Sequence, residues 1–193
     1  MGSVGELGKV LLFENKYNIK HMMKPLMNYL DYFKKSNTAV KANVSISWSG
    51  AISIDELSNG TLSNANKQIA DQKNVIYILM GENTQGEKAI DVGQTSNSLL
   101  ERTKQHLQNG DYLEGYPKNQ KVYCGKVSAG LTIGRELLEQ LEGIIIQYLV
   151  ENENYHLCND AKIQSFHQSY KIGYIENINR IGDLGTLLPP YLP

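Results

Sequence analysis

Cysteine is scarce in this chain of 193 residues, which contains only Cys124 and Cys158. The two are not spaced as a Cys-x-x-Cys pair and no cluster of His and Cys surrounds them, which argues against a disulfide framework or a structural zinc site. Long apolar runs are missing as well, since no stretch reaches the roughly 18 residues that a membrane helix needs. Residues 1–6 lack the basic start and apolar core of a secretory signal. We therefore expect a cytoplasmic protein with no membrane partner.

Charge of one sign is also lacking. The formal net charge is −1, which argues mildly against a large nonspecific nucleic-acid surface. The distribution is less even, because residues 1–73 carry nine lysines against six acidic residues and the remainder is acidic. This basic excess fits a segment that grips a phosphate backbone, and it fits an ordinary protein surface equally well.

The length and the globular composition, 41% hydrophobic and 20% charged, suit one domain with an elaboration. We predict an N-terminal elaboration over residues 1–73, for which DNA targeting is one reading. A core over residues 74–160 and a tail over 161–193 that packs on the core complete the division. Within the first part, apolar residues at spacings of three and four predict a helix over residues 17–35. Apolar and polar residues alternate over residues 38–54, as in strands, and Ser49-Gly50 is typical of a turn, so this segment predicts a hairpin.

The stretch from Asn74 to Leu107 is the most informative part of the chain. Residues 75–80 form an apolar run typical of a strand, and residues 89–93 predict its antiparallel hairpin partner. A helix should follow, because Ser98 and Glu101 have the spacing of a capping box and Gly110 suits a helix C-terminus. Residues 121–127 predict a third strand.

A second long helix is predicted from Arg135 to about Val150. It carries three glutamates, and at about 100° per residue only Glu142 borders its apolar stripe. Glu136 and Glu139 fall on the opposite side, where we expect them to be solvated.

Three pieces of the stretch from Asn74 to Leu107 together resemble the GIY-YIG nuclease family. Val75-Ile76-Tyr77 matches the first motif and Asp91-Val92-Gly93 matches the second. Arg102 and His106 match the Arg-x-x-x-His of the helix that follows, where residues four apart share a face. Two positions depart from the family pattern: valine replaces the first motif's glycine, and Asp91 replaces the second tyrosine. The resemblance covers under half of the chain.

The resemblance implies a role for each matching residue. Tyr77 would bind or deprotonate the attacking water, with support from His106, while Arg102 would stabilise the phosphate. Glu142 would bind a divalent cation, Mg²⁺ or Mn²⁺. Asn159 matches the asparagine that follows, although Asn154 is closer by spacing.

Three further residues lie in or beside the matching motifs. Gly93 fits a position where backbone approaches the reacting groups. Asp91 would bind metal or water, or cap a turn. Lys88 could handle a proton, although its strand position points it to the opposite face.

These expectations amount to an α+β fold, with a small three-stranded sheet flanked by the helices of Arg102 and Glu142 and extended by the N-terminal helix and hairpin. The expected function is metal-dependent endonuclease cleavage of DNA, either restriction-type or structure-specific. The alternative is a nucleic-acid-binding module that has kept the fold and lost catalysis. The sequence does not indicate an oligomeric state.

Overall fold

The computed structural model describes residues 40–110, 113–150, 155–159 and 170–192. All of them belong to one compact unit, which begins at Ala39. The predicted helix over residues 17–35 lies outside the described residues. None of the helices within the described ranges has the length and apolar character needed to cross a membrane.

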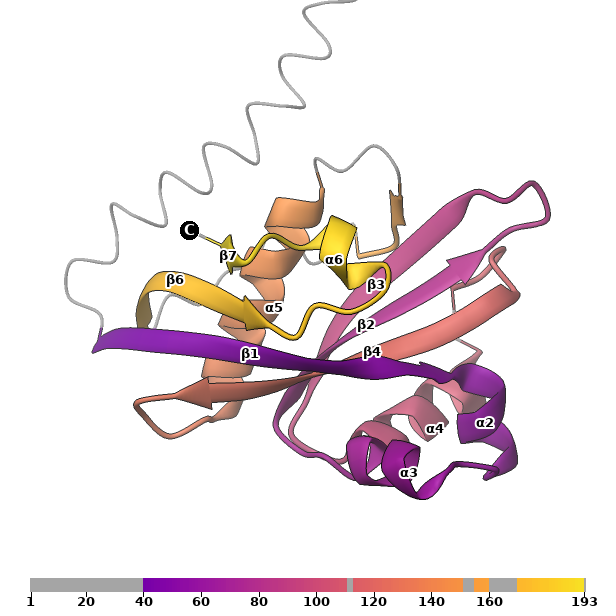
Figure 1. Cartoon of the computed structure of the whole chain (residues 1–193), viewed down its shortest axis with the longest axis horizontal. Coiled ribbons are helices and arrows are strands. Elements are labelled where there is room, and N and C mark those ends of the chain that lie inside the picture. The colour runs from indigo at the N-terminus through magenta and orange to yellow at the C-terminus, as the bar shows by residue number, and fades with distance from the viewer. Residues whose placement is uncertain (1–39, 111–112, 151–154, 160–169, 193) are drawn as a thin grey trace, which may run out of the picture. The chain divides into compact units, whose positions relative to one another are not determined.

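The described residues form a mixed α/β arrangement built on one curled, seven-stranded sheet (Figure 1). The strand order is β5-β3-β2-β4-β1-β6-β7. The bounds are β1 Val40–Ser53, β2 Val75–Glu82, β3 Lys88–Thr95, β4 Lys118–Ala129, β5 His156–Leu157, β6 Tyr170–Ile178 and β7 Tyr191–Leu192. Strand β2 lies between two antiparallel neighbours, and its residues 75–81 are all buried. Its unbroken apolar run therefore follows from burial on both faces.

Five helices accompany the sheet in the described part of the chain: α2 Ile54–Asn59, α3 Asn64–Ala70, α4 Leu99–Asn109, α5 Arg135–Leu149 and α6 Leu184–Leu187. Helices α2, α3 and α4 contact one another and gather at one end of the sheet (Figure 1). Helix α5 packs on β3 and β2. The side chains of Val75, Tyr77 and Leu79 share a core with Leu57 of α2 and Leu99 of α4.

The predicted small three-stranded sheet is wrong. The three strands exist and lie side by side as β3-β2-β4, but β1, β6 and β7 continue the sheet beyond β4, and β5 extends its other edge. The prediction failed because β6 pairs in parallel with β1, from Val40 opposite Tyr170 onward. Local sequence periodicity contains no information on a contact between segments so far apart.

The predicted hairpin over residues 38–54 is wrong for a different reason. Residues 40–53 are one strand that pairs with β4 along most of its length, and the register shifts between Ser49 and Ile52. Ser49-Gly50 therefore marks a β-bulge, which bends a strand without reversing it. Trp48, just before the bulge, is buried and donates a hydrogen bond from Nε1 to Oδ1 of Asn177, at 3.0 Å.

Helix α4 begins and ends as the sequence predicts. The Ser98 hydroxyl accepts from the Glu101 backbone N–H, and the Glu101 carboxylate accepts from the Ser98 N–H, which completes a capping box. Gly110 closes the helix in the left-handed conformation, with φ of 74°. Leu99 and Thr103 are buried, whereas Leu107 near the end of the helix is 36% exposed. The division of the chain at residues 73/74 and 160/161 stays a prediction.

Candidate active site

The hydroxyl group of Tyr77 connects strand β2 to helix α4. Its oxygen accepts a hydrogen bond from Nε of Arg102 at 3.2 Å and lies 2.9 Å from Nε2 of His106. The Tyr77 and His106 rings meet edge to face, at an angle of 77°. Arg102 and His106 can reach one atom together because residues four apart on a helix project from the same side. Three of the residues predicted for the site therefore meet at one oxygen atom.

The start of α4 fixes the position of the arginine and histidine. Besides its capping box, the helix is tied to the segment after α3, because the Leu99 N–H donates to the Gln72 carbonyl at 3.0 Å. Buried Leu99 and Thr103 hold one side of α4 against the core. Arg102 and His106 are half-buried at the border of that side, so they face both the core and the surface.

Gly93 of β3 makes room for the tyrosine ring. It lies opposite Tyr77 in the β2–β3 register. A Cβ added at Gly93 would overlap Cζ and the hydroxyl oxygen of Tyr77 and would stand 2.5 Å from Cε2. The ring thus lies flat over the glycine, and a side chain at position 93 would displace the hydroxyl from Arg102 and His106.

The surroundings of Tyr77 keep its phenol protonated. Burial raises its pKa well above the ordinary value, and the hydrogen bond and positive charge of Arg102 only partly oppose this. The negative charges of Asp91 and Glu142 raise the pKa further. Both carboxylates are therefore close enough to act electrostatically on the hydroxyl.

Glu142 of α5 is buried, with 6% of its surface exposed. Glu136 is exposed, and Glu139 is half-buried and forms an ion pair with Arg135 at 2.7 Å. The helix periodicity therefore identified which of the three glutamates turns inward. The cation-binding role of Glu142 stays a prediction.

Asn159 extends the edge of the sheet through its side chain. Its Oδ1 accepts from the Val92 N–H at 2.6 Å and its Nδ2 donates to the Val92 carbonyl at 2.9 Å. The Cys158 N–H donates to the Ile90 carbonyl just before it. The Asn159 side chain thus binds the backbone of β3 next to Gly93, with both its oxygen and its nitrogen hydrogen-bonded to Val92. Asn154 lies outside the described residues.

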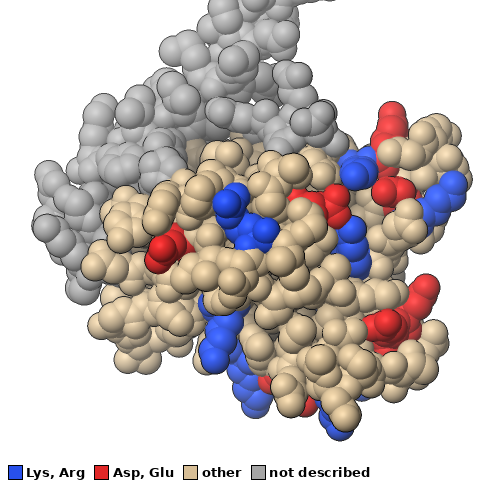
Figure 2. Space-filling view, viewed as in Figure 1, with Lys and Arg blue, Asp and Glu red and all other residues tan. Residues whose placement is uncertain are grey.

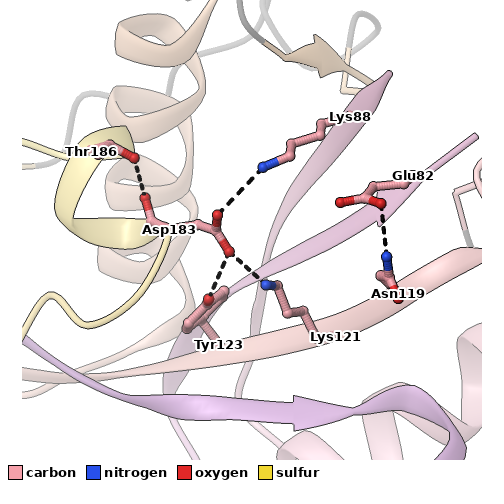
Figure 3. Close-up of polar contacts among 7 residues, drawn as sticks. All are labelled: Glu82, Lys88, Asn119, Lys121, Tyr123, Asp183 and Thr186. Carbon is pink, nitrogen blue, oxygen red and sulfur yellow. Dashed lines mark hydrogen bonds and ion pairs between the residues drawn. The ribbon is translucent and has the colours of Figure 1, made fainter. Parts of the chain in front are cut away.

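Asp91 and Lys88, the two remaining candidates, lie on opposite faces of β3. Asp91 is opposite Leu79 and shares the face of Gly93 and Tyr77, since strand residues two apart point the same way. It is half-buried. The Lys88 ammonium instead forms an ion pair with Asp183, at 3.6 Å (Figure 3). Lys88 is therefore not beside the phenol.

No sequence pattern indicates the cluster around Asp183. Its carboxylate contacts Lys121 at 2.5 Å and accepts from the Tyr123 hydroxyl at 3.2 Å, so residues of β3 and β4 converge on it (Figure 3). The lysine contact and nearby positive charges lower the pKa of Asp183, although partial burial opposes them. Alternation along β4 could have paired Lys121 with Tyr123 on one face. No local signal could have brought in a residue 62 positions away.

Metal-ligating residues are sparse at this site. Within the described ranges, no group of three or more His, Cys, Asp or Glu side chains is arranged to hold a metal ion. Mg²⁺ needs fewer protein ligands than such a group provides, because it keeps several waters and is often bound by one or two carboxylates together with substrate phosphates. Glu142 and Asp91, which both act on the Tyr77 hydroxyl, fit that pattern.

The surface charge is mixed on the face that Figure 2 shows. Lys and Arg (blue) are interspersed with Asp and Glu (red) on this face, and neither charge forms a large continuous patch. Among the described residues on this face, Lys and Arg therefore form no extended basic tract for a DNA backbone.

The chain matches no protein-family model, no curated protein and no solved structure.

Proposed function

We propose that this chain is a divalent-metal-dependent endonuclease that hydrolyses DNA phosphodiester bonds, with a site of the GIY-YIG type. The observation that carries the proposal is the meeting of Arg102, His106 and Tyr77 at one hydroxyl oxygen. The ring reaches that point only because position 93 has no side chain. The tyrosine of the first motif and the arginine and histidine of the following helix are thus in contact with one another, as a shared active site requires.

Phosphodiester hydrolysis needs a group that accepts the proton of the attacking water and a positive charge beside the phosphate oxygens. The phenol oxygen accepts from Nε of Arg102 and also lies beside Nε2 of His106. When His106 is protonated at Nδ1, its Nε2 accepts the phenol proton. The guanidinium has five N–H donors, and Nε is only one of them. The others can bind the phosphate, for which the planar fork is well suited.

The raised pKa of Tyr77 decides how the proton moves. A phenol held protonated by burial is a poor base at neutral pH. We assign Tyr77 the task of orienting the water and His106 the task of taking its proton through the phenol, which gives its own proton to Nε2 as it accepts the proton of the water. Histidine is suited to this because its ordinary pKa is about 6.5.

Glu142 is the residue that would hold Mg²⁺ or Mn²⁺, with Asp91 as a second carboxylate oxygen donor. When bound, such an ion neutralises charge that develops on the phosphate and the leaving oxygen. Glu142 is buried and acts electrostatically on Tyr77. A buried carboxylate is stabilised when a cation compensates its charge.

Asp91 supports the second candidate function, a nucleic-acid-binding module without catalysis. It replaces the family's second tyrosine and puts a negative charge near the phenol, where phosphate must also approach. An Asp91→Tyr variant separates the two functions. If the wild type is inert in Mg²⁺ and Mn²⁺ and this variant cleaves, the binding module is the correct reading.

The reaction would take place in the cytoplasm. Neither cysteine is in a disulfide, and Cys158 is exposed, which suits a reducing compartment.

The test is cleavage of supercoiled plasmid DNA by purified protein in Mg²⁺, with and without chelator. Wild type should nick or linearise the plasmid only with the metal. Glu142→Gln should abolish cleavage and retain DNA binding, because it removes the charge that holds the cation. Glu136→Gln, on an exposed position of the same helix, is the matched control and should cleave normally. Cleavage that survives in chelator or in Glu142→Gln would overturn the assignment.

A further inference from the structure

Two aromatic rings stack at the edge of the sheet. The His156 ring of β5 lies over the Tyr116 ring, with centroids 5.7 Å apart and 11° between the planes. His156 is exposed, whereas Tyr116 is half-buried. His156 therefore keeps exposed surface that a ligand can contact while its ring is stacked on Tyr116.

The strand register puts this stack on the face of the candidate site. Strand β5 pairs in parallel with β3, with His156 beside Ala89. Ala89, Asp91 and Gly93 alternate onto one face of β3, and Gly93 lies opposite Tyr77. Gly93 is four positions beyond Ala89 along the strand, a distance of about 13 Å. A few nucleotides, at about 3.4 Å each when stacked, can span that distance.

The lower ring of the stack is firmly held. The Tyr116 N–H donates to the Leu113 carbonyl at 2.9 Å, and the Tyr116 carbonyl accepts from Nε2 of Gln120 at 3.1 Å. A Cβ at Gly81 would stand 2.6 Å from that carbonyl oxygen, so the glycine allows this turn to close onto β2. Tyr116 also packs against the core that contains Tyr77. The stack is thus fixed to the same core as the candidate site.

We propose that His156, supported by Tyr116, is a stacking platform for an unpaired nucleobase a few nucleotides along the strand from the phosphate bound at Arg102. This inference rests on the proposed function and narrows its substrate to DNA with a single-stranded segment at the cleavage site. Flat aromatic side chains bind unstacked bases with little sequence preference. Bases inside a duplex are already stacked on one another and cannot use the platform.

The test is fluorescence anisotropy with a labelled single-stranded oligodeoxynucleotide, in chelator so that nothing is cut. A base-free strand of the same length is the second probe. His156→Ala should weaken binding of the intact strand about five- to hundredfold, as expected for the loss of one base stack. It should leave binding of the base-free strand unchanged. His156→Phe keeps a flat ring and should bind both strands as the wild type does.

Tyr191→Ala is the matched control. Tyr191 is 57% exposed and pairs edge to face with Tyr174 on strands β7 and β6, away from β3. Its loss should change neither affinity. The platform is refuted if His156→Ala binds the intact strand like wild type, if it weakens both strands equally, or if His156→Phe is as weak as His156→Ala. Wild type that binds no strand refutes it too.

Binding in chelator is independent of cleavage, so the two proposals can fail separately. A wild type that binds through His156 and never cuts refutes the nuclease and keeps the platform. One that cuts plasmid DNA with no dependence on His156 refutes the platform alone.

Discussion

Replacing Gly93 by alanine should damage the candidate site through one methyl group. The added Cβ would overlap Cζ and the hydroxyl oxygen of Tyr77. The ring is 2% exposed and belongs to the core, so it cannot move into solvent without unpacking its neighbours. The hydroxyl must therefore leave its positions beside Arg102 and His106.

The expected cost has two parts. Overpacking of a filled core typically costs about 1–3 kcal/mol, which urea unfolding followed by tryptophan fluorescence would measure. Misplacement of a reacting group by about 1 Å can cost on the order of 10²-fold in rate, which single-turnover cleavage would measure. In a Tyr77→Ala background the same substitution should cost much less stability, because the obstructing ring is absent.

Two other glycines serve as controls. A Cβ at Gly125 would stand 2.6 Å from Cγ2 of Ile46 and 2.8 Å from the Trp48 ring, so Gly125→Ala should lower stability similarly while cleavage persists. Gly173 of β6 has open space around it, and Gly173→Ala should change neither quantity. If Gly93→Ala is as stable as wild type, or its stability cost is unchanged without the Tyr77 ring, the packing argument is wrong.

Three further predictions concern stability and reactivity. Asn159→Ala leaves the buried Val92 N–H and C=O without their side-chain partner and should cost about 1–3 kcal/mol in urea unfolding; a change below about 0.5 kcal/mol would mean that water replaces the amide. Because burial raises the folded-state pKa of Tyr77 above the unfolded value of about 10, the unfolded chain loses this proton first as pH rises. The free energy of unfolding should then fall above about pH 10, less steeply in Tyr77→Phe, and equal slopes would refute the shift. Burial raises the pKa of the Cys124 thiol to about 12, and Cys158 is exposed, so a thiol reagent should modify Cys158 rapidly and Cys124 only in denaturant, as peptide mass mapping would reveal.

Local patterns predicted the local structure of the site. The cap at Ser98, the closing glycine at position 110 and the inward turn of Glu142 all follow from spacing within one helix. The pairing of residues 75–80 with 89–93 also follows, because a short polar turn joins two strand-like runs.

Long-range pairing could not be predicted in this way. Strand β1 was interpreted as a hairpin because Ser49-Gly50 is typical of turns, whereas its pairing with β4 on both sides of the bulge keeps it extended. The parallel partner of β1 lies about 130 residues further along the chain, at Tyr170. Nothing in either segment specifies that partner, since an alternating apolar strand can pair with any other.

Contacts of the candidate site within one helix were likewise predictable, whereas contacts between distant segments were not. Arg102 and His106 share a helix face, so their proximity was predictable. Their meeting with Tyr77 was expected only from the family resemblance, because the packing of α4 on β2 sets it. The stack of Tyr116 on His156 depends on β5 joining β3, which no pattern in residues 155–159 indicates.

In the proposed nuclease site, the Tyr77 hydroxyl beside Arg102 and His106 takes part in metal-dependent cleavage. Single-turnover cleavage of DNA in Mg²⁺ by Tyr77→Phe tests it most directly, since this change removes one oxygen atom and keeps the ring over Gly93. Circular dichroism should first establish that the variant is folded. The rate should fall about 10²–10³-fold while DNA affinity persists. A folded Tyr77→Phe protein that cleaves within about threefold of the wild-type rate would contradict the claim.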